Sequence, residues 1–220
     1  MSNDHTHEHD HDHGDQPILK YDDDSAHDYD EASRYTLLAE ALRQLLVEKE
    51  VIKANEVREY LQFMDSRGEE IGAKIIARAW AEPEFKDRLL ANGNEAISDY
   101  DIPMLGAELV VVENTDDVHN VVVCTLCSCY PRTILGLPPD WYKSKVYRSR
   151  AVNEPRAVLR EFGTELSDNV ALRVHDSNAD MRYLVMPKRP DGTDGWSQEQ
   201  LEGLVTRDSM IGVTTVKPAA

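Results

Sequence analysis

The chain has 220 residues and is 41% hydrophobic, which suffices for one principal core with an appendage and excludes a wholly disordered protein. Its 24 Lys and Arg against 41 Asp and Glu give a formal net charge of -17, which argues against nucleic acid and anionic membrane surfaces as partners. No apolar run approaches the roughly 20 residues of a membrane-spanning helix, and the N-terminus lacks the apolar stretch of a secretory signal, so we expect a cytoplasmic protein.

The acid is concentrated at the start of the chain. Residues 1–31 contain eleven acidic side chains and one lysine, and His alternates with acid from His5 to His13. Because this segment has almost nothing to bury, we expect a disordered acidic, His-rich tail. It either scavenges divalent metal or only solvates the chain.

Residues 32–101 are expected to form a helical arm. Apolar side chains recur there at helical spacing in four short segments, the last of which begins at Pro83, a residue suited to a first helical turn. Either a partner subunit or the rest of the chain must cover these stripes. They consist of Leu37, Leu38, Ala41, Leu42, Leu45 and Leu46, then Val57, Tyr60, Leu61 and Met64, then Ile71, Ile75, Ile76, Ala79 and Trp80, and finally Phe85, Leu89 and Leu90.

Residues 102–220 change to an extended pattern. The turn-forming residues Asn114, Thr115, Asp116 and Asp117 lie between the Val-rich runs 108–113 and 119–124, which predicts a strand pair joined by a turn. Further strands are predicted at 170–175 and 181–186. The predicted fold class is α+β, with an N-terminal helical arm followed by a mixed α/β layered domain that has a strand-rich core.

Two helices are also predicted in this second half. One spans residues 155–162, between the predicted strands. The last one starts at Ser197, where Gln200 three residues later completes the S-x-x-Q pattern of a capping box.

All three cysteines of the chain lie within six residues, Cys124-Thr125-Leu126-Cys127-Ser128-Cys129. The odd count and the strained ring that a Cys127–Cys129 bridge would close argue against a disulfide framework. An iron–sulfur cluster usually needs four thiolates. A zinc site could take His119 or His175 as its fourth ligand, so a structural zinc module with three cysteines and one histidine stays open.

The Cys-Ser-Cys segment is also suited to hold a metal with sulfur and main-chain nitrogen together. The Cys127 thiolate, the deprotonated amides of Ser128 and Cys129, and the Cys129 thiolate close small chelate rings in one plane. Cys124 can then take one axial position and leave the opposite one free. Such a set suits low-spin Co(III) or Fe(III) better than tetrahedral zinc, and its net charge of about -2 calls for cationic neighbours.

The segment 121–131, Val-Val-Val-Cys-Thr-Leu-Cys-Ser-Cys-Tyr-Pro, resembles the metal claw of the nitrile hydratase α subunit. The resemblance extends over nearly everything from Glu69 onward and leaves the His-rich tail outside. Its further motifs are residues 135–143, 147–150, 154–156, 189–196 and 206–212.

This resemblance implies an enzyme that adds water to a small-molecule nitrile and yields the amide. It implies one Co(III) per chain, or less favourably Fe(III), with Cys124, Cys127, Ser128 and Cys129 as ligands. Thr125 stands where iron-type members usually have Ser, which favours cobalt. Cys127 would become a sulfinate and Cys129 a sulfenate, and either water or the sulfenate oxygen would attack the nitrile carbon while the metal acts as Lewis acid.

The resemblance also implies partners. The arginines that hold the oxidised cysteines come from a β subunit in this family, so we expect an obligate α/β complex, in the form α2β2. A metallochaperone is a further expected partner. Residues 102–220 would then form the metal-binding catalytic domain and residues 32–101 the arm that wraps the partner.

Two positions depart from the family pattern. Arg132 follows Tyr130-Pro131 where nitrile hydratases commonly have Trp, and Leu105 lies close to where many members have Gln. The γ subunit of thiocyanate hydrolase, a close relative with the same claw, also has Arg at the first position, and an Arg favours an anionic substrate. A metal-bearing subunit of thiocyanate hydrolase is therefore the alternative function.

The expected catalytic residues are Cys127, Cys129, Tyr130 and Arg132. The remaining aromatic and basic candidates have two readings each. Trp141 and Tyr142 line the pocket or pack in the core. The basic residues face the partner or form surface ion pairs, and they are Arg148, Arg150 and Arg156.

Overall fold

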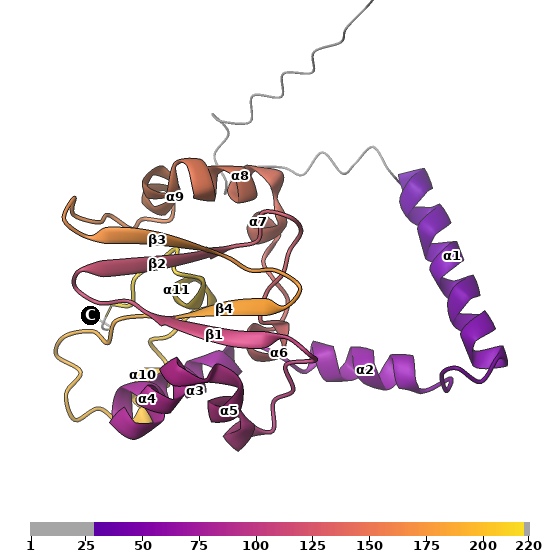
Figure 1. Ribbon diagram of the computed structural model, residues 1–220, viewed down its shortest axis with the longest axis horizontal. Coiled ribbons are helices and arrows are strands. Elements are labelled where there is room, and N and C mark those ends of the chain that lie inside the picture. The colour runs from indigo at the N-terminus through magenta and orange to yellow at the C-terminus, as the bar shows by residue number, and fades with distance from the viewer. Residues whose placement is uncertain (1–28, 218–220) are drawn as a thin grey trace, which may run out of the picture.

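Four strands form the centre of the structure, a computed structural model that describes residues 29–217 (Figure 1). They pair in parallel, β1 with β4 and β2 with β3, and Figure 1 shows them in the spatial order β3, β2, β4, β1. Val111 lies opposite Leu184 in the first pair, and Val122 lies opposite His175 in the second. The strands are β1 (Glu108–Glu113), β2 (Val118–Val123), β3 (Ala171–Asp176) and β4 (Met181–Met186).

The four predicted strands are confirmed, but the prediction that β1 and β2 pair through a turn is wrong. Two buried asparagines occupy the place of a ladder between them. The Asn120 amide donates to the Asn114 side-chain oxygen at 2.7 Å, and the Asn120 side chain donates to the Glu113 carbonyl at 2.7 Å. Since β2 is buried along nearly its whole length, its continuous Val-rich run is typical of a strand in a parallel sheet.

Helices near β1 complete one side of the core. Ile75, Ile76 and Leu89 are fully buried and belong to the same cluster as Val111 and Val185. Each such side chain stabilises the fold by about 1.5–3 kcal/mol relative to an exposed one. The stripes predicted for residues 71–80 and 85–90 are therefore covered by the chain itself. This side consists of α3 (Glu69–Ala81), α4 (Pro83–Ala91), α5 (Gly93–Ile97) and the 3-10 turn η3 (Ser98–Tyr100).

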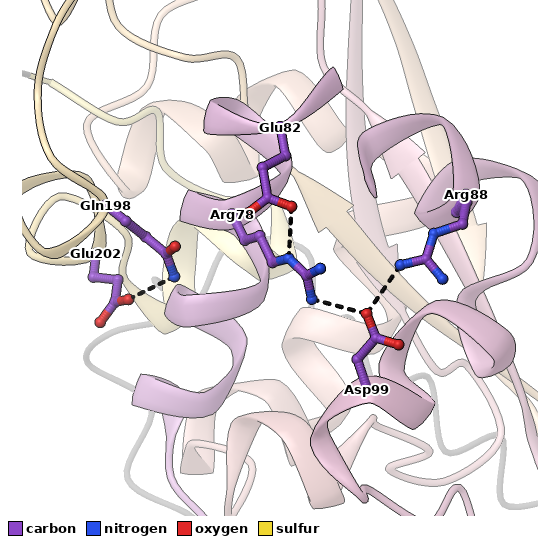
Figure 2. Close-up of polar contacts among 6 residues, drawn as sticks. All are labelled: Arg78, Glu82, Arg88, Asp99, Gln198 and Glu202. Carbon is purple, nitrogen blue, oxygen red and sulfur yellow. Dashed lines mark hydrogen bonds and ion pairs between the residues drawn. The ribbon is translucent and has the colours of Figure 1, made fainter. Parts of the chain in front are cut away.

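An ion network on the surface connects α3, α4 and η3 (Figure 2). Asp99 accepts hydrogen bonds of 2.9 Å from both Arg88 and Arg78, and Arg78 also donates to Glu82 at 2.9 Å. The hydrogen bonds from Arg88, which has the larger effect, and from Arg78 lower the pKa of Asp99. The Arg78 guanidinium also lies over the Phe85 ring, 4.1 Å from its centroid. Because the network is solvated, it contributes more to the relative placement of the helix ends than to stability.

The remaining helices are short. The predicted helix at 155–162 is confirmed as α9, and the predicted start at Ser197 is confirmed as α10, with both bonds of the capping box present. Gln198 and Glu202 bond at 3.1 Å along α10 (Figure 2). Helix α10 is not the last, because α11 follows and packs against β2 and β4. These elements are α6 (Arg132–Leu135), α7 (Asp140–Lys143), α8 (Lys145–Asn153), α9 (Pro155–Glu161), α10 (Gln198–Glu202) and α11 (Arg207–Ile211).

The first two helices, α1 (Tyr29–Glu48) and α2 (Glu56–Asp65), extend away from the strands (Figure 1). Their apolar side chains are largely exposed, with Leu37 at 68% and Leu61 at 53%. Met64, near the end of α2, is buried. The tail predicted for residues 1–31 lies almost wholly outside the described residues. Within the described part of the chain, none of the helices combines the length and apolarity needed to cross a membrane.

Gly212, which follows α11, provides a test of this packing. Its φ is +89°, and an added Cβ would overlap the Asn120 carbonyl oxygen. We expect Gly212→Ala to lower the free energy of unfolding by about 1–2 kcal/mol for the left-handed backbone and by a further 1–3 kcal/mol, roughly, for the overlap. Gly163→Ala is the matched control, because φ is +78° there and no atom lies within 4 Å of the added Cβ. Equal losses in chemical denaturation would contradict this account.

Candidate metal centre

The cysteine segment begins where β2 ends. Cys124 follows the last residue of β2 and is fully buried, whereas Cys127 is exposed and Cys129 is half-buried. Asp176, the last residue of β3, accepts hydrogen bonds from the Thr125 amide at 2.9 Å and the Thr125 hydroxyl at 2.6 Å. Because β2 and β3 are parallel, their carboxyl ends meet, and this contact fixes the loop between the first two cysteines.

The three cysteine sulfurs converge on one point. All lie within 4.8 Å of one another, with Cys124 Sγ 3.5 Å from Cys127 Sγ and Cys127 Sγ 3.3 Å from Cys129 Sγ. The described residues show no other cluster of three or more His, Cys, Asp or Glu side chains with this spacing. The predicted sulfur donors are thus brought together.

The sulfur separations can be compared with those that a bound ion would impose. Two sulfurs each about 2.3 Å from one ion are about 3.3 Å apart at a right angle and about 3.8 Å apart at a tetrahedral angle. The 3.3 Å between Cys127 Sγ and Cys129 Sγ matches the right-angle value, and the 3.5 Å between Cys124 Sγ and Cys127 Sγ lies between the two values. The Cys127–Cys129 pair therefore suits an ion with octahedral or square geometry better than tetrahedral zinc.

Main-chain amides also face the sulfurs. The Cys127 amide donates to Cys124 Sγ at 3.2 Å. The pKa of the Cys127 thiol is lowered, first by its hydrogen bond with Cys129 and to a smaller extent by the Ser128 and Cys129 amides. Burial raises the pKa of the Cys129 thiol to about 12, while the nearby Arg182 guanidinium acts in the opposite direction. The two amides required for a mixed sulfur and nitrogen site therefore act on the Cys127 sulfur.

The histidines considered as zinc ligands are bound elsewhere. His119 is buried, donates from Nε2 to the Gly212 carbonyl at 2.7 Å, and contacts Asn114 through Nδ1 at 3.3 Å. His175 donates to the Asn120 side-chain oxygen at 2.9 Å. Neither belongs to the cysteine cluster among the described residues. The hypothesis of a zinc module with His119 as fourth ligand therefore loses that ligand.

A cluster of aromatic side chains, which includes Trp141, Tyr142 and Tyr147, packs next to the cysteine segment. Tyr142 is fully buried, and its hydroxyl donates to the Cys129 carbonyl at 2.9 Å. Trp141 packs edge-on against Tyr147 at 4.8 Å and Phe162 at 4.7 Å. Of the two readings for Trp141 and Tyr142, core packing is therefore the one observed, with a polar contact from Tyr142 to the claw backbone.

A pocket of about 340 Å³ opens beside the cysteines. Tyr130 and Arg132 line it, as does Leu105, so both departures from the family pattern lie at the site. The Tyr130 hydroxyl is buried and has no hydrogen-bond partner in the described part of the chain, and burial raises its pKa. Helix α2 contributes Tyr60 and Met64 to the pocket wall.

The basic residues considered at sequence level have structural roles in the chain. Arg148 donates to the Leu126 carbonyl at 3.1 Å and so holds the exposed part of the claw loop. Arg150 is buried and paired with Glu154 and Glu161, both at 2.6 Å. Arg156 donates to main-chain carbonyls of the segment before β3.

Two functional candidates were missed at sequence level, Asp176 and Arg182. Asp176 lies at the end of a predicted strand, which is a usable signal, but only the parallel pairing with β2 brings it to the claw. Arg182 is the second residue of β4 and lines the same pocket as Cys129, whose pKa its charge lowers. Nothing in the local sequence marks it.

Tyr142 and Tyr147 form a matched pair for testing the support of the claw. The Tyr147 hydroxyl donates to the Val122 carbonyl at 2.7 Å, and both tyrosines are fully buried. We expect Tyr142→Phe and Tyr147→Phe each to lower the free energy of unfolding by about 0.5–1.5 kcal/mol, because each removes one hydrogen bond made by a fully buried side chain. Only Tyr142→Phe should also shift the visible absorption of the metal-loaded centre, because only this bond ends on a claw residue. Identical spectra for the two variants would contradict that role.

Comparison with known proteins identifies the family. The sequence profile described as "Nitrile hydratase, alpha chain" matches residues 33–214. The cobalt-containing nitrile hydratase subunit alpha of Pseudonocardia thermophila is 49% identical over 185 residues, which cover 83% of this chain and 91% of that protein. The thiocyanate hydrolase subunit gamma of Thiobacillus thioparus is 42% identical, covering 86% of this chain and 83% of that protein.

A solved structure agrees with this result. A double mutant of the Fe-type nitrile hydratase from Comamonas testosteroni Ni1 superposes with a TM-score of 0.75 at 40% identity, covering 84% of this chain and 91% of that one. The profile match spans most of the chain and includes the cysteine segment. The chain therefore belongs to the nitrile hydratase α-chain family.

Proposed function

We propose that this chain is the metal-bearing α subunit of a nitrile hydratase, which adds water to a nitrile to form the amide. The observation that carries the proposal is the convergence of three cysteine sulfurs beside a small pocket, whose wall includes Cys127 and Cys129. The family membership supports the same reaction. In the balanced step, oxygen of one water bonds to the nitrile carbon and two protons end on nitrogen.

The ligands in this proposal are the sulfurs of Cys124, Cys127 and Cys129 and the amide nitrogens of Ser128 and Cys129. Cobalt is proposed as the ion, one per chain, because Thr125 follows the cobalt-type pattern and a cobalt-containing relative is 49% identical. The likeness to an Fe-type structure keeps iron as the alternative. When bound, the ion supplies Lewis acidity toward the nitrile.

The chain's own residues would then orient the substrate and limit water. The side chains of Met64 and Leu105 form an apolar part of the pocket wall. Tyr130 holds a protonated hydroxyl there, since burial raises its pKa. In this proposal Cys127 carries a sulfinate and Cys129 a sulfenate, whose oxygen is a candidate nucleophile beside water. Tyr142 keeps the Cys129 backbone in place through its hydrogen bond to the carbonyl.

The partner in this proposal is a nitrile hydratase β subunit, in an α2β2 complex, with a metallochaperone for loading. The exposed apolar stripe on α1 and α2 supports such an interface. Single exposed apolar side chains are common on any protein surface, whereas a run of several along one helix face usually marks an interaction site. Its exposed members are Tyr35, Leu37, Leu38, Leu42, Leu45, Tyr60 and Leu61.

Thiocyanate hydrolysis is the second candidate, and Arg132 is the observation that favours it. The reaction would convert one thiocyanate ion and two waters to carbonyl sulfide, ammonia and hydroxide. A guanidinium in the pocket wall suits an anion of this kind. The relative from Thiobacillus thioparus is named a subunit of such an enzyme.

Metal analysis and turnover test the proposed function. We expect the chain, purified with the product of its neighbouring gene, to contain about one cobalt per chain and to hydrate a short aliphatic nitrile. Cys127→Ala should lose both the metal and the turnover, because it removes the sulfur that contacts both others. One zinc per chain without cobalt or iron, or turnover of thiocyanate alone, would overturn the proposal.

The arm can be tested separately. Leu38→Glu with Leu42→Glu places two charges on the exposed stripe of α1, where each side chain is more than half exposed. We expect at least a roughly tenfold loss of affinity for the partner subunit, because apolar area is replaced by charge at the interface. The circular dichroism of the isolated chain should not change, since neither residue belongs to its core. Unchanged complex formation in size-exclusion chromatography would contradict an interface on this stripe.

A further inference from the structure

The pocket beside the claw has a wall of one charge sign. Arg132 and Arg182 both line it, and none of its lining residues is an Asp or Glu. Neither arginine takes part in an ion pair within the described residues. The Arg132 Nε is buried and has no hydrogen-bond partner there, and the one side-chain hydrogen bond of Arg182 goes to the Met181 carbonyl. Arg132 as a whole is half-buried, but a buried guanidinium N–H without an acceptor is costly unless a ligand completes the site.

The two arginines have different surroundings. Arg182 lines the pocket together with Cys127 and Cys129, so its charge would offset part of the negative charge that the claw carries with its metal. Arg132 is the first residue of α6 and follows Tyr130 and Pro131. No Asp or Glu of the described chain lines the pocket beside it. Arg132 would therefore attract an anion that enters the pocket, while Arg182 weakens the repulsion between that anion and the negatively charged claw.

We propose that this pocket selects small substrates in which the cyano group is joined to a negative charge, with Arg132 binding the charged end. This inference rests on the proposed function and specifies the substrate class of that site. The pocket volume of about 340 Å³ is near the lower limit for ligand pockets, so the substrate is short. Short cyanocarboxylates and thiocyanate share this chemistry. For a cyanocarboxylate, one water adds across the carbon–nitrogen bond and the carboxylate is unchanged.

The test compares two substrates of the same shape, 3-cyanopropanoate and 3-cyanopropanamide, with the metal-loaded complex. We expect kcat/KM for the carboxylate to exceed that for the amide, and the advantage to shrink as salt is raised. Arg132→Gln should lower the ratio of the two kcat/KM values at least roughly tenfold, which corresponds to the loss of one charge-assisted hydrogen bond. Arg132→Lys should restore part of it. Lys188→Gln changes the net charge equally on an exposed side chain outside this pocket and should leave the ratio unchanged.

Binding provides a readout that does not depend on turnover. Calorimetric titration with butanoate should show at least roughly tenfold weaker binding to Arg132→Gln than to the unaltered complex. Equal ratios and equal butanoate affinities in the two proteins would overturn the inference while leaving nitrile hydration intact. Absence of all turnover together with Arg132-dependent butanoate binding would instead overturn the proposed function and retain the anion site. Thiocyanate is assayed alongside 3-cyanopropanoate. The anion with the larger kcat/KM is the better representative of the natural substrate.

Discussion

The parallel pairing of β2 with β3 is the constraint on which the site depends. It brings the carboxyl end of β3 next to the carboxyl end of β2, so that Asp176 meets Thr125 while the cysteines follow immediately. The buried end of β2 anchors Cys124, and the Tyr142 hydroxyl holds the Cys129 carbonyl at the other end of the segment. A loop of six residues is thereby restrained at its first two residues and at its last one. This restraint explains how an exposed sulfur such as Cys127 can lie 3.3 to 3.5 Å from two others without a disulfide.

The convergence of the three cysteine sulfurs could be predicted from the sequence, because all three lie within six residues. The main-chain amide ligands stay a prediction. Asp176 and Arg182 could not be predicted in the same way, because their approach depends on which strands are neighbours. The pattern of β1, turn and β2 favours a hairpin, which would have placed β1 directly beside β2, where β4 lies instead (Figure 1). The hydrogen bonds between the buried Asn114 and Asn120 take the place of main-chain pairing between β1 and β2. Local sequence rules do not predict this replacement.

The helical region shows the same limit of periodicity. Ile75 and Leu37 both belong to stripes with helical spacing, yet Ile75 is fully buried by this chain and Leu37 is 68% exposed. Periodicity identifies the face that must be covered and carries no information on what covers it. The difference lies in neighbours distant in sequence, since α3 packs with α10 and α6 whereas α1 extends away from the strands (Figure 1). Helix α2 connects the two situations, because Met64 is buried and lines the pocket while Leu61 remains exposed.

The charge of the pocket follows from an imbalance between its two halves. In the proposed function, five anionic donors around a trivalent ion would keep about two negative charges, and Arg182, which lines the pocket together with Cys127 and Cys129, would offset part of them. The charge of Arg132 is not neutralised within the described residues. Its buried Nε has no hydrogen-bond partner there, and no carboxylate lines the pocket. A tryptophan in its place would fill the same wall with apolar surface and need no counter-charge. The substitution of a cation for an aromatic ring therefore changes the electrostatics of the pocket wall while the donor set of the claw is unaltered, so that metal chemistry and substrate charge are determined by separate residues.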